Sequence, residues 1–281
     1  MTETERVAIV TGSGGMRGIG RAIALRFARD GYDVVLMDIK RSPEQLPPDE
    51  VRAGWQGIES VAAEIGALGR RALPSYADIT KADQVDRVVT DAVAKLGRID
   101  ILVNNARAII GASEPVVEMD ESEWDRIMGV NAKGTFLCSR AVARYFLREG
   151  VRGKIVNISS SAGKRGSAKE SAYCASKFAI IGFTQSLAME MAPSGITVNA
   201  VCPGLVNSGR FSLREKMGAE QEGVSLEEYE GRRIERRSRQ VPLGKPATSD
   251  DIANMVAFLA SAQADHITGQ SFNVNGGEFM H

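Results

Sequence analysis

The sequence predicts an α/β protein built on a doubly wound parallel sheet of about seven strands, with helices on both faces. Short apolar runs rich in β-branched residues alternate along the chain with amphipathic stretches of helical period. Most of these runs are too apolar to face water on either side, as is typical of parallel strands between two layers of helices. We predict strands at residues 7–10, 34–37, 99–103, 155–158, 197–201 and 271–274.

A weaker strand signal, "RALPSYAD" (residues 71–78), is interrupted by Pro74. Proline lacks the N–H that a central strand needs, so we expect this strand at an edge of the sheet. In a doubly wound sheet with strand order 3-2-1-4-5-6, the third strand along the chain is an edge. The position of Pro74 therefore supports this order.

Composition indicates one globular domain covering residues 1–281. Of the 281 residues, 43% are hydrophobic and 25% are charged, and α/β folds longer than about 200 residues often form a single domain. The 35 Lys and Arg residues balance 35 Asp and Glu residues, so the bulk charge indicates neither a nucleic-acid partner nor a membrane-surface partner. The amino terminus lacks the apolar core of a signal peptide, and no apolar run approaches the roughly 18 residues of a membrane span.

The cysteines and histidines give no sign of a metal site or a disulfide framework. Cys138, Cys174 and Cys202 are too widely spaced for either, and the chain has only two histidines. We therefore expect the cysteines to be small buried apolar residues. Together with the amino terminus, this favours a reducing, cytoplasmic setting.

A glycine-rich stretch, "TGSGGMRGIG" (residues 11–20), lies between the first predicted strand and a helical pattern. Glycines there allow close approach to a pyrophosphate, and the N-terminus of the helix supplies unpaired N–H groups. Asp38 follows at the end of the second predicted strand, where an acid binds the ribose hydroxyls of a dinucleotide. The combination predicts a Rossmann-type nucleotide loop.

A second cluster, "SAYCASKFAIIGFT", places Tyr173 and Lys177 four residues apart. On a helix the two side chains lie on one face, one turn from each other. An ammonium group nearby favours the phenolate, so Lys177 would help Tyr173 to give up its proton. Upstream, Ser160 of "NISSSAG" follows a predicted strand, and its hydroxyl could donate to a substrate oxygen as charge develops.

Seven motifs occur in one order along the chain: "TG…GIG", "ADIT", "NNA", "MGVNAKGTF", "NISS", "YCASK" and "VNAVCPG". In this the chain resembles the short-chain dehydrogenases/reductases in their common single-domain form, over nearly its whole length. The resemblance implies that Tyr173 is the catalytic acid/base and that Lys177 assists it and holds the nicotinamide ribose. It also implies that Ser160 polarises the carbonyl and that Asn131 positions a proton-relay water. The expected catalytic residues are thus Asn131, Ser160, Tyr173 and Lys177.

The resemblance also implies a binding surface for a nicotinamide dinucleotide. Asp78 would face the adenine, Asn104 would lie under the cofactor, and the backbone after Pro203 would hold the carboxamide, with Ser208 where the family usually has threonine. The expected cofactor-binding residues are Gly12, Ser13, Arg17, Gly18, Ile19, Gly20, Asp38, Asp78, Ile79, Asn104, Ala106, Tyr173, Lys177, Pro203, Gly204, Val206 and Ser208.

The chain departs from the family pattern at four places. The glycine loop has two residues more than the usual three between its first two glycines, so residues 13–16 must bulge. Arg107 replaces the glycine of the usual "NNAG", where it could clamp an anionic substrate or point to solvent or a subunit contact. Residues 41–57 and 207–240 exceed the family minimum, and we predict that 207–240 is a helical substrate lid.

Asp38 indicates NAD, because its carboxylate would bind both ribose hydroxyls and repel a 2′-phosphate. The opposing indication is the basic residues Arg17, Lys40 and Arg41, which in some relatives bind the phosphate of NADP. We predict NAD, with NADP as the alternative.

We expect an enzyme that interconverts a small secondary alcohol, such as a sugar, polyol or hydroxy acid, and its ketone by hydride transfer. One alternative is a 3-oxoacyl-thioester reductase that uses NADPH. An enoyl-thioester reductase of the same superfamily is a related alternative. Those enzymes place lysine six residues after tyrosine, where this chain has Ala179. A non-catalytic NAD-binding regulator or scaffold is the alternative of another class, although such proteins usually lose a catalytic group. The resemblance also implies a homotetramer or a dimer.

Overall fold

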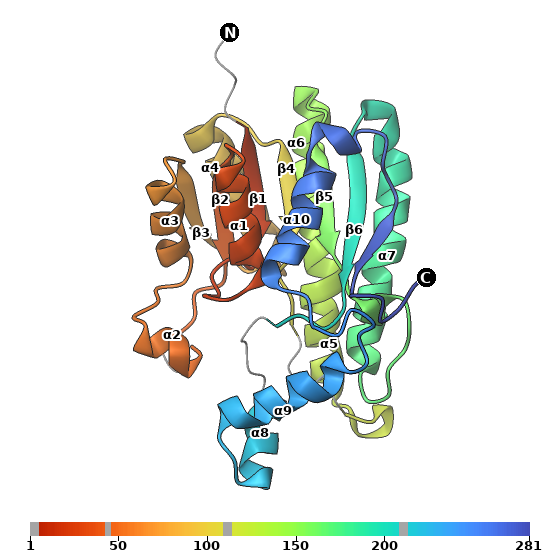
Figure 1. Ribbon diagram of the computed structural model, residues 1–281. Helices are drawn as coiled ribbons and strands as arrows, with labels where there is room; N and C mark the ends of the chain where they lie inside the picture. The colour runs from red at the N-terminus through yellow and green to blue at the C-terminus, as the bar shows by residue number, and fades with distance from the viewer. Residues whose placement is uncertain (1–5, 43–45, 109–113, 208–212) are drawn as a thin grey trace.

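The computed structural model describes residues 6–42, 46–108, 114–207 and 213–281. These residues form one parallel sheet of seven strands in the order β3-β2-β1-β4-β5-β6-β7 (Figure 1). The strands are β1 (Val7–Thr11), β2 (Asp33–Asp38), β3 (Ala72–Tyr76), β4 (Ile101–Asn104), β5 (Lys154–Ile158), β6 (Thr197–Pro203) and β7 (Ser271–Val274). The predicted doubly wound order is confirmed, and β7 extends it beyond β6.

The edge position predicted for the proline-containing strand is also confirmed. β3 pairs only with β2 in the described sheet, and Pro74 lies opposite Leu36. The fourth strand begins later than predicted, at Ile101 instead of Ile99. Its pairing with β1 starts at Ile101, and just before it the Asp100 carboxylate accepts a hydrogen bond from the Val7 N–H at 2.9 Å.

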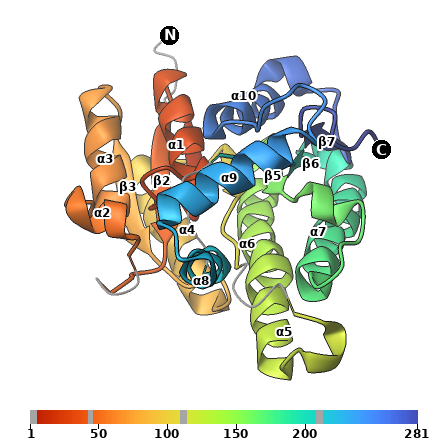
Figure 2. The same cartoon turned by 60° about the horizontal axis from the view of Figure 1, so that its bottom comes forward.

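Helices cover both faces of the sheet (Figures 1 and 2). The α-helices are α1 (Ile19–Arg29), α2 (Pro48–Arg52), α3 (Ile58–Ala67), α4 (Ala82–Leu96), α5 (Glu121–Met128), α6 (Gly134–Glu149), α7 (Ser171–Met191), α8 (Leu213–Glu222), α9 (Leu226–Ser238) and α10 (Ser249–Ala260). Alternate residues of β1 face opposite layers: Ala8 and Val10 pack with α1, α3 and α10, whereas Val7 and Ile9 pack with α4, α6 and α7. Two hydrophobic cores result, one on each face.

The first helix shows how the sequence directs this packing. Ile19, Ile23 and Phe27 are spaced for one face of a helix, and all three are buried in the core. The chain leaves α1 through Gly31, whose φ of +87° favours glycine. The chain thus returns into β2 as the sequence predicts.

Three segments gather at the carboxyl edge of the sheet, where ligands bind in open α/β folds. The first is the turn from β1 to α1, and the second is the short helix α2 of the excursion after β2 (Figure 1). The third is the pair α8 and α9, which pack on each other beyond β6 (Figure 2). The helical content expected for residues 207–240 is confirmed for its described part. No helix among the described residues is both long and apolar enough to cross a membrane.

Candidate active site

Glycines in the loop between β1 and α1 permit close backbone approaches. Gly12 has φ +66°, and a Cβ there would lie 2.7 Å from the Cα of Ala106. A Cβ at Gly20 would lie 2.3 Å from the carbonyl oxygen of Gly12. No side chain caps α1 at Gly18, so the first N–H groups of the helix remain available to a ligand.

Asn105 joins this loop to the end of β4. Its side-chain amide donates to the carbonyl oxygens of Thr11 (2.9 Å) and Gly12 (3.0 Å). The hydroxyl of Thr11 accepts from the N–H groups of Asn105 and Ala106, both at 3.0 Å. Asn104 and Ala106 are among the residues expected from the sequence, whereas Asn105 is not, although the doubled asparagine of "NNA" was the available signal.

Asp38 ends β2 beside the glycine loop and is only 9% exposed. One carboxylate oxygen accepts from the N–H of Gly14 at 2.8 Å, and the other accepts from the N–H of Ile39 at 2.8 Å. The guanidinium of Arg41 lies 3.5 Å from the same carboxylate, whereas Arg17 pairs with Asp49 at 3.6 Å. Two of the three nearby basic residues are thus engaged with carboxylates.

The other residues expected near the adenine and under the cofactor have structural partners. Asp78 accepts from both the N–H and the hydroxyl of Thr80 and shapes the turn after β3. Ile79 is buried against Gly134 at the start of α6. Asn104 is buried and donates to Ser139 and Asn157, both at 2.8 Å, which ties β4 to α6 and β5.

The residues expected to hold the carboxamide follow the end of β6. Pro203 is the last residue of β6, and the N–H of Gly204 donates to the carbonyl oxygen of Val274 at 3.2 Å. Val206 forms a parallel bridge with Ala247. Ser208 lies outside the described residues.

Helix α7 carries Tyr173 and Lys177. Tyr173 is partly exposed, whereas Lys177 is 1% exposed. The ammonium of Lys177 donates to the carbonyl oxygen of Ile158 at 2.8 Å and lies 5.8 Å from the centroid of the Tyr173 ring. Burial, followed by the positive charge of Arg107, lowers the pKa of Lys177 to about 7. Arg107 therefore has an electrostatic effect on Lys177, although its own side chain is exposed.

The loop after β5 brings Ser160 to the same helix. The hydroxyl of Ser159 donates to the carbonyl oxygen of Lys177 at 2.9 Å, and a Cβ at Gly163 would lie 2.7 Å from that oxygen. Ser160, between these two contacts, is partly exposed, and its hydroxyl accepts from the N–H of Ala162 at 3.2 Å. Ser160 and Tyr173 are thus both partly exposed, whereas Lys177 is buried.

Asn131 lies in a π-helical turn, η3 (Gly129–Lys133), between α5 and α6, and is fully buried. Its side chain forms two hydrogen bonds with the backbone of Ala108, at 2.8 and 3.1 Å, and donates to Ser176 at 2.9 Å. Because Ser176 neighbours Lys177, this asparagine braces the segment after β4 against the catalytic helix. Single π-turns of this kind are frequent at functional sites.

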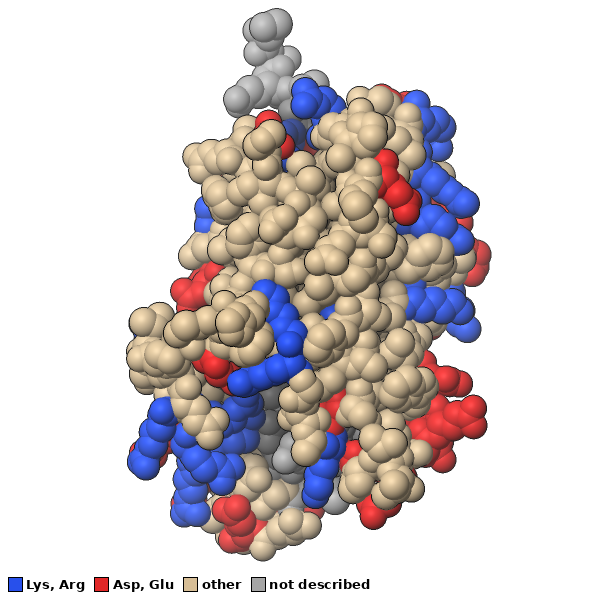
Figure 3. Space-filling model, turned by 90° about the vertical axis from the view of Figure 1, so that its right-hand side faces the viewer, with Lys and Arg blue, Asp and Glu red and all other residues tan. Residues whose placement is uncertain are grey.

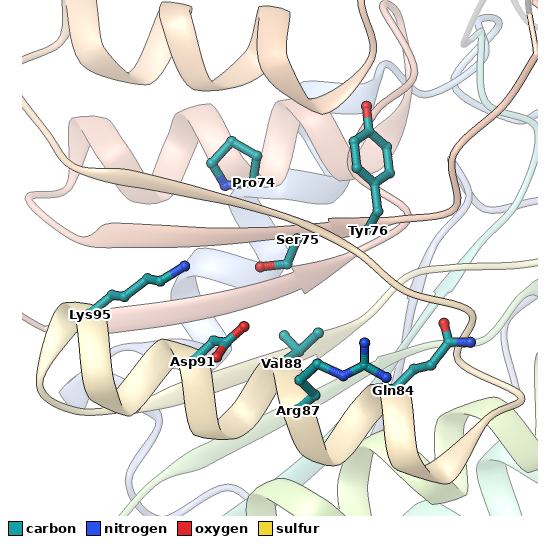
Figure 4. Close-up of a pocket in the computed structure, with 8 residues that line it drawn as sticks. All are labelled: Pro74, Ser75, Tyr76, Gln84, Arg87, Val88, Asp91 and Lys95. Atoms are coloured by element: carbon teal, nitrogen blue, oxygen red, sulfur yellow. The ribbon is translucent and has the colours of Figure 1, made fainter.

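A separate hollow lies at the sheet edge between β3 and α4 (Figure 4). The residues that line it are Pro74, Ser75, Tyr76, Gln84, Arg87, Val88, Asp91 and Lys95. None of the expected catalytic or cofactor-binding residues is among them. The hollow is therefore separate from the site that the sequence predicts.

The fold and the site together define a nicotinamide-dependent oxidoreductase, with a dinucleotide-type loop between β1 and α1, a serine in the loop after β5, and a tyrosine and a lysine on α7. A family profile described as short chain dehydrogenase matches residues 6–217. The chain belongs to the short-chain dehydrogenase family and is an NAD(P)-dependent enzyme that acts on CH–OH groups.

Several relatives match almost end to end. Galactitol 2-dehydrogenase of Agrobacterium fabrum is 36% identical over 280 residues, covering 100% of each chain. The 3-oxoacyl-(acyl-carrier-protein) reductase FabG of Staphylococcus epidermidis is 36% identical over 273 residues, covering 97% of this chain and 98% of the relative. The crystal structure of acetoin dehydrogenase from Enterobacter cloacae superposes with a TM-score of 0.77 at 33% identity, covering 98% of this chain and 96% of that one.

Proposed function

We propose that the protein is an NAD-dependent dehydrogenase that interconverts a small polyol, diol or sugar and its ketone. The observation that carries this proposal is the partly exposed Tyr173 near the buried ammonium of Lys177, with the loop of the partly exposed Ser160 bound to the same helix through Ser159. The name of the galactitol relative supports a polyol, and that of the acetoin relative supports a small hydroxy ketone.

The glycine loop fits a dinucleotide on structural grounds. The close approaches at Gly12 and Gly20 leave backbone, and not side chains, facing the helix N-terminus. The hydroxyl of Ser13 is buried and has no partner among the described residues, which suits a phosphate acceptor. When bound, the nicotinamide would accept or supply the hydride.

The proton chemistry falls to three side chains of this protein. The Tyr173 hydroxyl would take the proton of the substrate hydroxyl during oxidation and return it during reduction. Ser160 would donate a hydrogen bond to the same substrate oxygen. In its charged form, Lys177 would stabilise the phenolate, held in place by the carbonyl oxygen of Ile158.

The choice of NAD over NADP rests on Asp38. A 2′-phosphate would bring negative charge to a buried carboxylate that is already held by the N–H groups of Gly14 and Ile39. The nearest cation, Arg41, is paired with that carboxylate. Charge repulsion in such a partly dry site is costly.

The helix pair α8 and α9 would act as a lid. It follows β6 at the carboxyl edge, where substrate must enter beside Tyr173 (Figure 2). Its surface is strongly charged, with pairs such as Arg232–Glu228 and Arg239–Glu235. Charged outer faces keep a mobile cover soluble, so this segment suits a lid better than a core element.

A homotetramer or a dimer would cover apolar side chains that the single chain exposes. Phe136 on α6 and Phe178 and Met189 on α7 are 40%, 46% and 72% exposed. Figure 3 shows the side that carries α7 and the chain's C-terminal end, where uncharged residues dominate the upper half. Burial of these exposed apolar side chains would stabilise an assembly, and sedimentation velocity would give the subunit number.

A cytoplasmic location suits the cysteines. All three are buried and free, and burial raises the pKa of Cys138 to about 12. Such thiols are unreactive and remain reduced in that compartment.

The decisive test is an absorbance assay of nicotinamide reduction with NAD and with NADP over a panel of polyols, diols, sugars, hydroxy acids and aryl alcohols. We expect the highest kcat/KM with NAD and a neutral polyol or diol. Activity confined to aryl alcohols, or no activity with any member of the panel, would contradict the proposed substrate class.

A second candidate substrate class is favoured by Arg107, whose charge acts on Lys177. A guanidinium at this position could bind a carboxylate or phosphate on the substrate. If hydroxy acids are preferred, Arg107→Ala should raise KM for them and leave KM for neutral alcohols unchanged. Because of the FabG relative, the assay panel should also include a 3-oxoacyl thioester, tested with NADPH in the direction of reduction.

A further inference from the structure

The two departures near the nucleotide site, the extended glycine loop and the excursion at residues 41–57, contact each other. The N–H of Met16 donates to a carboxylate oxygen of Glu50 at 2.8 Å. The indole N–H of Trp55 donates to the carbonyl oxygen of Gly14, also at 2.8 Å. The excursion therefore binds the extra residues of the loop through two side chains.

Glu50 is an unusual residue for a short surface helix. Its side chain is 3% exposed, although Val51 and Arg52 beside it on α2 are exposed. One of its oxygens holds Met16, and the other is buried with no hydrogen-bond partner in the described part of the chain. Burying a carboxylate is costly unless it is bonded, so the bond to Met16 is what keeps this side chain inside.

Asp38 completes the set of contacts. Its carboxylate accepts from the N–H of Gly14, while Trp55 donates to the carbonyl oxygen of the same residue. The loop forms one turn of its own, from the N–H of Gly18 to the carbonyl oxygen of Gly15 at 3.0 Å. Outside that turn, the N–H and the carbonyl of Gly14 and the N–H of Met16 are held by side chains from β2 and the excursion.

A glycine-rich loop has a high conformational entropy, and each added residue raises the cost of ordering it. Fixing such a loop before the ligand arrives improves affinity, because less conformational entropy is then lost on binding. A further contact extends the support beyond the inserted residues: the Ser249 hydroxyl at the start of α10 donates to the carbonyl oxygen of Arg17 at 3.1 Å.

We propose that Glu50 and Trp55 are positioning residues of the nucleotide loop, which hold residues 13–17 in the shape that receives the dinucleotide pyrophosphate. This rests on the proposed function only in that the loop binds a nicotinamide dinucleotide. It assigns the excursion at residues 41–57 a role in cofactor affinity, although neither Glu50 nor Trp55 need touch the cofactor.

The first measurement is amide hydrogen exchange of the cofactor-free protein over residues 12–20. Glu50→Ala should speed exchange there by about tenfold, because a bond to a charged acceptor is lost. Glu50→Gln should restore slow exchange, since its amide oxygen can still accept from Met16. Glu59→Gln is the matched control, because Glu59 accepts from Tyr76 on the neighbouring edge strand and does not touch the loop.

The second measurement is the Kd for NAD by calorimetry, without substrate. We expect Glu50→Ala to weaken binding about tenfold and Trp55→Phe, which keeps the ring but loses the donor, about fivefold. Glu50→Gln and Glu59→Gln should remain within twofold of the wild-type protein. If the wild-type protein bound neither NAD nor NADP, the proposed function would fail, and hydrogen exchange would still judge the positioning role.

The proposal would be overturned if folded Glu50→Ala exchanged its amides over residues 12–20 at the wild-type rate and also bound NAD with an unchanged Kd. If that variant did not fold, Trp55→Phe would carry both measurements. Wild-type exchange rates and an unchanged Kd for NAD in Trp55→Phe would then overturn the proposal.

Discussion

The ammonium of Lys177 lies 5.8 Å from the centroid of the Tyr173 ring and is held by the carbonyl oxygen of Ile158, at the end of β5. The helix sets the spacing of the two side chains, whereas the sheet supplies the acceptor that fixes the lysine. Chemistry at this site therefore depends on the docking of α7 against β5 as well as on the residues themselves.

Tyr173→Phe should lower kcat by about a thousandfold, because the proton donor and acceptor is lost. The Kd for NAD should stay within threefold, since the glycine loop and Asp38 are untouched. Steady-state kinetics and calorimetry give the two values. Tyr76→Phe, at the far edge strand, is the control and should retain full activity; a similar rate for both variants would refute the assignment.

Asp38→Asn should shift the preference towards NADP. The amide can still accept from Gly14, so this variant removes the charge and leaves the loop contact. We expect the ratio of kcat/KM for NADP to that for NAD to rise about tenfold or more, which corresponds to about 1.4 kcal/mol. An unchanged ratio, or a wild-type preference for NADP, would show that Asp38 does not select the nucleotide.

Lys177→Met should change how stability depends on pH. The pKa of Lys177 in the folded protein is about 7, below the ordinary 10.5, so between these values the unfolded chain binds more protons than the folded one. Wild-type stability should therefore rise with pH across this window. The full destabilisation of the folded state by the buried ammonium should be present below pH 7. This destabilisation is on the order of 5 kcal/mol.

The measurement is the free energy of unfolding in urea at several pH values from 7 to 10. The Met variant should exceed the wild-type protein most at pH 7, and the difference should shrink as the pH rises. A difference that stays constant with pH would mean that the lysine titrates normally in the folded state.

Arg107→Ala should raise the pKa of Lys177, because it removes a positive charge that lowers it. Arg107→Lys keeps that charge and is the matched control. Titration of the lysine ammonium by nitrogen-detected NMR in the cofactor-free protein would follow both. If neither variant moved the titration, Arg107 would have no electrostatic effect on the site.

Sequence alone predicted the order of the sheet, which is confirmed, and a set of catalytic residues, which stays a prediction. Buried parallel strands need continuous apolar runs, and Pro74 is tolerated only at an edge, so local composition encoded the topology. Tyr173 and Lys177 were found because helical spacing is a local property, and Ser160 because it follows a strand. Even so, their roles came from the resemblance to a family and not from the spacing.

Only the tertiary structure decided the contacts between segments that lie far apart in the chain. Glu50 and Trp55 lie 34 and 41 residues beyond the loop residues that they hold, and no periodicity links them. The sequence could say that residues 13–16 must bulge, but not that the excursion at residues 41–57 receives the bulge. Such pairings depend on how the elements pack, because a hydrogen bond forms wherever the fold places a donor beside an acceptor, whatever their separation in sequence.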